Sequence, residues 1–349
     1  MKKIFQHKTK ATFIVAFSLL SITIIAQKNY PVVEVLTSGT NTSIRGLSVV
    51  NDNVIWVSGS NGTVGKSTNG GRTFKWMTVK GFEKTDFRDI EAFDASTAVI
   101  MGIAEPAYIL KTTNGGNSWQ VVYENKTKGM FLDAMEFWNE KAGIVVGDPI
   151  DGRFFIARTM DNGSTWQENV LDKRPLADSG EGCFASSGTN VRPLDISEAV
   201  FVSGGLKSRI FIRDKIIDLP IIQGTETTGA NSVSVFDNYK TTSAKRIIVV
   251  GGDFKNDSSI LSNCVYSNDG GQSWQKASTP PHGYRSCVEF LAKREIVACG
   301  LNGVDYTVNG GKNWRWISKE GFHVCRISKY GASVFLAGAN GKIGKLVWK

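Results

Sequence analysis

The stretch Ser267-Asn268-Asp269-Gly270-Gly271-Gln272-Ser273-Trp274 decides the fold, because four further copies of it punctuate the chain. The other copies cover residues 67–74, 112–119, 159–166 and 307–314, and each ends in a tryptophan or, in the first copy, in Phe74. Each copy follows a run of residues typical of a β-strand. Similarity that recurs every roughly 40–50 residues is typical of propellers and solenoids. We therefore interpret the chain as a repeat structure.

Seven β-like runs that end in small residues predict one strand in each of seven repeats. These runs cover residues 55–59, 98–102, 143–147, 199–204, 246–252, 296–300 and 334–338. Another β-like run precedes each of them, a third leads into the motif, and the motif's aromatic residue opens a fourth. Short strands separated by Gly and Asn turns indicate an all-β repeat fold. Seven four-stranded units predict a single seven-bladed β-propeller over residues 27–349.

The two ends of the chain complement each other in this interpretation. The seventh unit ends at residues 344–348 and lacks a fourth strand, and residues 30–36 form a β-like run that can supply it. Such pairing closes the ring and covers an otherwise exposed sheet edge. The fourth unit departs from the pattern: residues 211–215 stand where the motif belongs, and a long irregular stretch, residues 172–190, precedes it. Loops of that length are usually functional or disordered.

Residues 1–26 have the pattern of a secretory signal peptide. Four lysines precede the apolar residues 11–25, and Ala26 is a plausible cleavage point. The apolar run is shorter than the roughly 20 residues that span a bilayer, so we expect no stable membrane insertion. Cleavage lowers the formal net charge from +9 to +5, which is too mild to indicate nucleic-acid binding. We expect an exported monomer, periplasmic or secreted.

The repeated motif resembles the Asp-box of bacterial neuraminidase-type (BNR) repeats, Ser/Thr-x-Asp-x-Gly-x-Thr-Trp. The acidic position holds Asp161 and Asp269 in two copies and Asn69, Asn114 and Asn309 in the others. The resemblance implies a β-turn between the third and fourth strands of a blade, remote from any catalytic centre. Turn chemistry agrees, because Asp or Asn caps the turn and Gly adopts positive φ. We expect these five residues to be structural and not metal ligands.

The whole chain is also similar to the photosystem II stability/assembly factor-like propellers. The supporting phrases are residues 86–90 (DFRDI), 147–149 (GDP), 251–254 (GGDF) and 283–286 (GYRS). This resemblance implies an exported propeller that binds a protein partner, an unassembled membrane or exported protein, without catalysis or a cofactor.

A set of polar residues recurs at one position of the predicted first strands, which line the channel of a propeller. Alignment of these strands places Leu132 and the candidate binding residues Arg45, Arg88, Asn231, Arg285 and His323 at that position, with the candidates Asp89 and Asp133 one residue later. Guanidinium groups suit carboxylates and phosphates. Two interpretations remain open: the charges neutralise one another in the channel, or the arginines form a mouth that binds an acidic peptide segment or another anion.

A sialidase-like glycoside hydrolase is the alternative function. Asp-boxes, an arginine cluster and paired carboxylates favour it, but sialidases have six blades, and Tyr284 and Tyr108 are weak candidates for the nucleophile. We therefore expect no catalytic residues. The three histidines and the spacing of the five cysteines match no metal-binding motif, and we expect the cysteines to be buried in strands.

Overall fold

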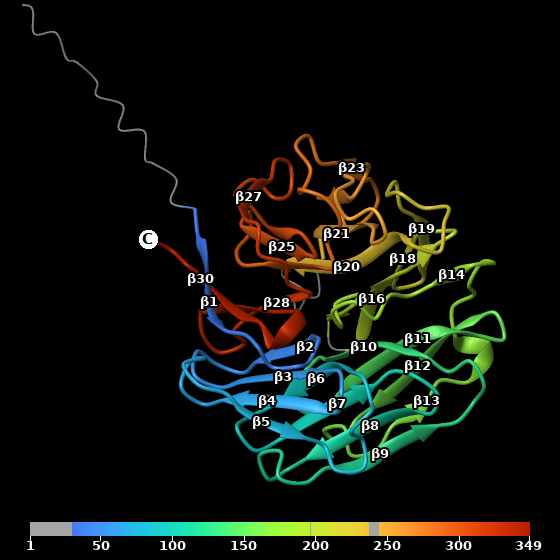
Figure 1. Ribbon diagram of the computed structural model, residues 1–349. Helices are drawn as coiled ribbons and strands as arrows, with labels where there is room; N and C mark the ends of the chain where they lie inside the picture. The colour runs from blue at the N-terminus through green and yellow to red at the C-terminus, as the bar shows by residue number, and fades with distance from the viewer. Residues whose placement is uncertain (1–29, 196, 237–243) are drawn as a thin grey trace, which may run out of the picture.

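Seven antiparallel sheets are arranged as the blades of a ring in the computed structural model, which describes residues 30–195, 197–236 and 244–349 (Figure 1). The predicted seven-bladed propeller is confirmed. Blade 1 has β2 (Ile44–Val49), β3 (Ile55–Gly59), β4 (Thr63–Ser67) and β5 (Lys75–Thr78). Blade 2 has β6 (Phe87–Ala92), β7 (Ala98–Gly102), β8 (Ala107–Thr112) and β9 (Gln120–Asn125). Blade 3 has β10 (Leu132–Phe137), β11 (Gly143–Ile150), β12 (Arg153–Thr159) and β13 (Gln167–Glu168).

The remaining blades continue the same order. Blade 4 has β15 (Val191–Leu194), β16 (Glu198–Val202), β18 (Arg209–Ile212) and β19 (Lys215–Asp218). Blade 5 has β20 (Thr228–Phe236), β21 (Arg246–Asp253), β22 (Cys264–Ser267) and β23 (Gln275–Lys276), and its sheet is extended by β17 (Gly204–Gly205) and β14 (Glu181–Gly182). Blade 6 has β24 (Cys287–Phe290), β25 (Ile296–Gly300), β26 (Gly303–Thr307) and β27 (Arg315–Ser318).

The seventh blade closes the ring with a strand from the other end of the chain. β1 (Val32–Thr37) pairs antiparallel with β30 (Ile343–Val347), which follows β28 (Val324–Ile327) and β29 (Val334–Ala337) (Figure 1). The register places Val33 opposite Leu346 and Val35 opposite Gly344. The predicted closure is therefore confirmed.

The fourth blade replaces the repeated motif with a tighter turn. β18 and β19 are joined by Arg213 and Asp214 alone, and Arg213 adopts a φ of 54°. The long stretch before this blade contains the 3-10 helix η1 (Leu171–Lys173) and the short strand β14, which pairs with β17. A second 3-10 helix, η2 (Ala339–Gly341), precedes β30.

The five motifs form turns with one hydrogen-bonding pattern. In the copy at residues 267–274, the Ser267 hydroxyl donates to Asp269 Oδ1 at 2.7 Å, and Asp269 Oδ1 accepts the Ser273 N–H at 3.0 Å. Asn69, Asn114, Asp161 and Asn309 accept the equivalent N–H in their own turns. Gly270 and Gly271 adopt positive φ, as the tight turn requires.

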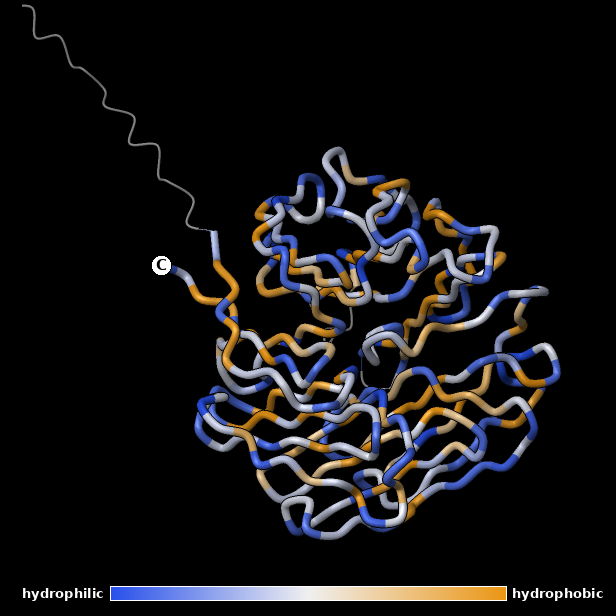
Figure 2. Tube along the Cα trace, in the orientation of Figure 1, coloured by the Kyte–Doolittle hydropathy of each residue, from blue (hydrophilic) through white to orange (hydrophobic). Residues whose placement is uncertain are grey.

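The core is divided among the interfaces between blades, and the motif aromatics contribute to it. Trp274 packs against a cluster that includes Ile210 and Val233, and Trp119 makes an edge-to-face contact with Trp56 of the preceding blade. Figure 2 shows apolar strand segments separated by polar turns. No helix in the described part of the chain is long and apolar enough to cross a membrane. The predicted signal peptide lies outside the described residues.

We predict that Asp269→Ala lowers the free energy of unfolding by about 0.5–2 kcal/mol, the usual cost of losing a side-chain cap. Asp269→Asn should retain most of the stability, because Asn fills this position in three of the other turns. Urea denaturation of both variants at pH 7 measures the difference. Equal stability of the alanine variant and the wild type would contradict a capping role.

Candidate functional site

β-bulges position a ring of polar side chains at the end of the channel where the first strands begin, which we call the upper mouth. The register of the first two strands slips by one residue at Arg45, Arg88, Asp133 and Asn231. A bulge leaves one residue without a partner opposite it and re-aims its side chain. Asp133, and not Leu132, therefore corresponds to the two arginines, which corrects the predicted alignment for blade 3.

The basic part of the upper mouth comes from blades 7, 1 and 2. Arg45 is partly buried and donates to the Ser186 carbonyl at 3.2 Å, and burial together with Arg88 lowers the pKa of Arg45. Arg88 pairs with Asp86 at 2.8 Å and keeps 27% of its side chain exposed. His323 contacts the Ser43 hydroxyl at 3.2 Å, and burial and the two arginines lower its pKa to about 3. His323 is therefore neutral at physiological pH.

Arg285 does not reach this mouth, although the sequence alignment predicted it there. Its guanidinium is fully buried within blade 6, where its Nε donates to Asp305 at 2.7 Å and its Nη1 donates to Asn302 at 2.6 Å. A buried charge needs a partner, and Asp305 supplies it from the third strand of the same blade. The predicted cationic ring is thus corrected to two arginines, Arg45 and Arg88.

The acidic candidates are buried and lie toward blade 3. Asp89 accepts the N–H groups of Ile90 and Met135, and burial raises its pKa well above the usual value. Asp133 is 0% exposed, and neither of its carboxylate oxygens has a hydrogen-bond partner among the described residues. Burial and nearby Asp148 raise the pKa of Asp133. Neither Asp89 nor Asp133 forms the predicted ion pair with an arginine of the ring.

Asn231 takes part in a satisfied polar cluster instead of facing solvent. Its Oδ1 accepts the hydroxyl groups of Ser186 at 2.7 Å and Tyr284 at 2.8 Å. Burial raises the pKa of Tyr284 to about 12. These contacts fix the loop that carries Ser186 against blades 5 and 6.

Residues 183–190, the last part of the long irregular stretch, cross the channel and contact most blades. Besides the Arg45 contact with blade 1, the Ser187 hydroxyl donates to the Ser286 carbonyl of blade 6 at 2.7 Å. The Cys183 N–H donates to Asp148 of blade 3 at 2.9 Å, and Arg326 of blade 7 donates to the Gly188 carbonyl at 3.2 Å. The segment therefore forms the floor of the upper mouth, and we call it the plug.

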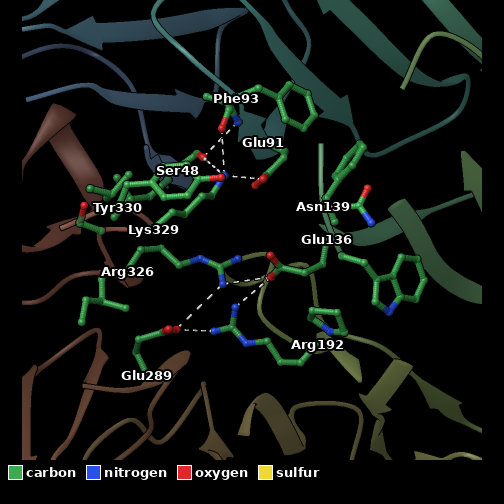
Figure 3. A pocket seen from close by; sticks show the side chains of 18 of the residues that line it. Ser48, Glu91, Phe93, Glu136, Asn139, Arg192, Glu289, Arg326, Lys329 and Tyr330 are labelled. Atoms are coloured by element: carbon green, nitrogen blue, oxygen red, sulfur yellow. Dashed lines mark hydrogen bonds and ion pairs between the residues drawn. The ribbon is translucent and has the colours of Figure 1, made fainter. Parts of the chain in front are cut away.

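A cavity of about 880 Å³ opens on the other end of the channel, and we call it the lower basin. Its walls include Phe93 and Tyr330 (Figure 3), together with Trp138 and Phe236. Its lining also includes one polar residue from the first strand of each blade, and in the four blades with a bulge this residue lies three positions after it: Ser48, Glu91, Glu136, Arg192, Ser234, Glu289 and Arg326. The predicted alignment of first strands missed this second ring, because in blades 3 and 6 it was one residue out of step with the other blades and pointed to Met135 and Val288 in place of Glu136 and Glu289.

Ion pairs bridge the lower basin, and those of Arg192 with Glu289 and of Arg326 with Glu136 join blades that are not neighbours in the ring. Arg192 pairs with Glu136 at 2.9 Å and with Glu289 at 2.5 Å, and Arg326 reaches Glu136 at 3.1 Å (Figure 3). Burial raises the pKa of Glu289 to about 8 against the opposing effect of Arg192. Lys329 and Glu91 form a separate pair. The basin is therefore a ring of largely compensated charges.

The chain is similar to solved propeller structures. A structure of YCF48 bound to D1 peptide has a TM-score of 0.64 at 16% identity and covers 92% of this chain and 96% of that one. YCF48 from Cyanidioschyzon merolae has a TM-score of 0.64 at 17% identity over 90% of this chain and 98% of that one. The WD40 β-propeller domain of Doa1 has a TM-score of 0.60 at 12% identity and covers 92% of this chain and 98% of that one. At these identities the likeness concerns the fold. No family model and no curated protein matches the chain.

We predict that Asp148→Asn stabilises the protein at pH 8 but not at pH 4. Burial raises the pKa of Asp148 to about 6, so the native state disfavours its ionised form. The native state loses stability as the pH rises through 6, on the order of 1–3 kcal/mol, and the neutral amide avoids this loss. Thermal unfolding of the variant and the wild type across pH 4–8 measures this loss. A stability difference between the two proteins that does not change with pH would contradict the raised pKa of Asp148.

We predict that Arg192→Ala lowers the free energy of unfolding by about 3 kcal/mol, the lower end of the cost of breaking a buried ion pair, because it leaves Arg326 as the remaining cation beside buried Glu136 and Glu289. The matched control is Arg213→Ala, whose pair with Asp195 is 3.3 Å long and whose side chain is 37% exposed. The control should cost at most about 1 kcal/mol. Chemical denaturation of both variants tests this, and equal losses would count against the ion-pair network.

Proposed function

We propose that this protein is an exported, non-enzymatic propeller that binds an acidic segment of a membrane or exported protein at its upper mouth. The observation that carries the proposal is that Arg45 is partly buried without an ion-pair partner among the described residues. Its guanidinium is partly buried, its one hydrogen bond among the described residues is to a backbone carbonyl, and no carboxylate of those residues pairs with it. An arginine in this state is suited to a carboxylate that arrives with a ligand.

The surroundings of Arg45 favour a peptide as the source of that carboxylate. Arg88 adds a second guanidinium with an exposed part, and the plug forms a polar floor beneath both. Similarity to a propeller whose structure contains a bound D1 peptide supports this kind of partner. Export rests on the pattern of residues 1–26, which agrees with a partner outside the cytoplasm.

The geometry disfavours the sialidase-like alternative. Tyr284 is buried, donates to Asn231, and has a pKa of about 12, whereas a nucleophile needs access and activation. Asp89 uses its carboxylate to cap two backbone N–H groups. We expect no turnover of sialosides or aryl glycosides.

The proposal is tested by capture of partners from a membrane extract with immobilised protein. The double variant Arg45→Ala/Arg88→Ala should lose at least tenfold in capture of the bound proteins, whereas Arg72→Ala, an arginine on an outer turn, should not. Capture by the wild type should weaken between 0.05 and 0.5 M salt, because screening shortens the range of exposed charges to below about 10 Å.

A synthetic Asp/Glu-rich peptide, compared with its Asn/Gln counterpart by fluorescence anisotropy, identifies the group that is recognised. Preference for the acidic peptide that disappears in the double variant supports the proposal. Equal capture by the wild type and a correctly folded double variant would overturn it.

A further inference from the structure

Three of the five cysteines meet in the core although they are far apart in sequence. The sulfur atoms of Cys287, Cys299 and Cys325 all lie within 4.8 Å of one another, and each side chain is 0% exposed. Cys287 and Cys299 lie opposite each other on β24 and β25 of blade 6, and Cys325 comes from β28 of blade 7. All three are free thiols, as are Cys183 and Cys264 elsewhere in the protein.

Cys264, Cys287, Cys299 and Cys325 lie in strands, which confirms the predicted placement for these four.

The spacing of these sulfurs is close to that of a metal thiolate site. Metal–sulfur bonds of about 2.3 Å place three sulfurs about 4.0 Å apart around a trigonal ion. Cys287 and Cys325 are 3.6 Å apart, and the largest separation in the group is within 4.8 Å. Side-chain adjustments of less than about 1 Å therefore complete the geometry.

The number and type of ligands select the ion. Among the described residues, the group contains three thiols and no His, Asp or Glu. Structural zinc almost always takes four ligands, whereas soft thiolates also favour Cu(I). A fully buried three-sulfur site without a fourth ligand is therefore better suited to Cu(I) than to zinc.

Neighbouring groups suit a thiolate at Cys287. The Cys325 N–H donates to Cys287 Sγ at 3.3 Å, and the Arg192 guanidinium contacts the carbonyl of adjacent Val288 at 3.5 Å. Donors and positive charge around a ligating sulfur compensate its negative charge. In the metal-free protein the Cys287 thiol donates to the Cys325 carbonyl at 3.3 Å, and coordination replaces that bond.

We propose that Cys287, Cys299 and Cys325 bind a single Cu(I) ion. The ion links blade 6 to blade 7, the blade that β1 closes. Because the sulfurs are fully buried, the ion enters while the chain folds, before blade 7 packs on blade 6. Binding then stabilises the closed ring, since an ion that binds only the native state shifts the folding equilibrium.

The experiment refolds the full chain from denaturant under anaerobic, reducing conditions with and without Cu(I), then removes free copper with a chromophoric Cu(I) chelator. We expect about one copper per chain by elemental analysis, a thiolate-to-copper absorption band in the ultraviolet, and a higher Tm. Cys299→Ser should retain less than a tenth of the copper. The matched control Cys264→Ser, which removes a buried strand thiol outside the group, should retain all of it.

Cys325→Ala serves as a second variant if Cys299→Ser fails to fold, and it should lose copper equally. Retention of zinc in place of copper in a parallel refolding would overturn the choice of ion. A Cys287–Cys325 disulfide in protein isolated from cells, or full copper retention by the folded cluster variants, would overturn the site.

Discussion

The pairing of β1 with β30 is the constraint on which the rest of the structure depends. Each blade buries its apolar faces against two neighbours, so the ring is complete only when the seventh blade gains its outer strand from residues 32–37. An open seventh blade exposes unpaired backbone groups and an apolar face together. Closure of the ring also fixes the diameter of the channel, and with it which first-strand side chains can meet across the axis.

Bulges, and not strand order alone, decide which side chains occupy the upper mouth. A slip of one residue aims Arg45, Arg88 and Asp133 at the channel, whereas the side chain of Arg285 turns into its blade. The pairing of β24 with β25 has no such slip, and Arg285 lies two residues before β24, where its side chain meets the buried Asp305 carboxylate. Arg45, at a bulge, instead donates to a backbone carbonyl of the plug. The asymmetry of the mouth thus depends on the register of each blade and on the position of acidic partners.

The repeat pattern predicted the blade number, the second strands and the closing strand, because each depends on local periodicity and turn chemistry that recur in every unit. It did not predict the fate of Arg285, because its partner Asp305 lies two strands later and only the fold brings them together. The plug was recognisable as an unusual stretch, but its contacts with blades 1, 3, 5, 6 and 7 depend on the closed ring. The ion pairs of Arg192 were missed for the same reason, because Glu136 and Glu289 belong to other repeats, 56 and 97 residues away in sequence.

Charge is handled in opposite ways at the two ends of the channel. In the lower basin, Arg192 and Arg326 lie between carboxylates, so an acidic ligand there must displace existing partners and gains little. At the upper mouth, Arg45 donates to a backbone carbonyl and pairs with no carboxylate of residues 30–195, 197–236 and 244–349, so an arriving carboxylate would add an interaction without breaking an ion pair there. In the free protein, the Ser186 carbonyl of the plug already compensates part of the free-energy cost of burying the Arg45 guanidinium. The upper mouth is therefore the end of the channel where the acidic segment that we propose as the ligand gains most from binding.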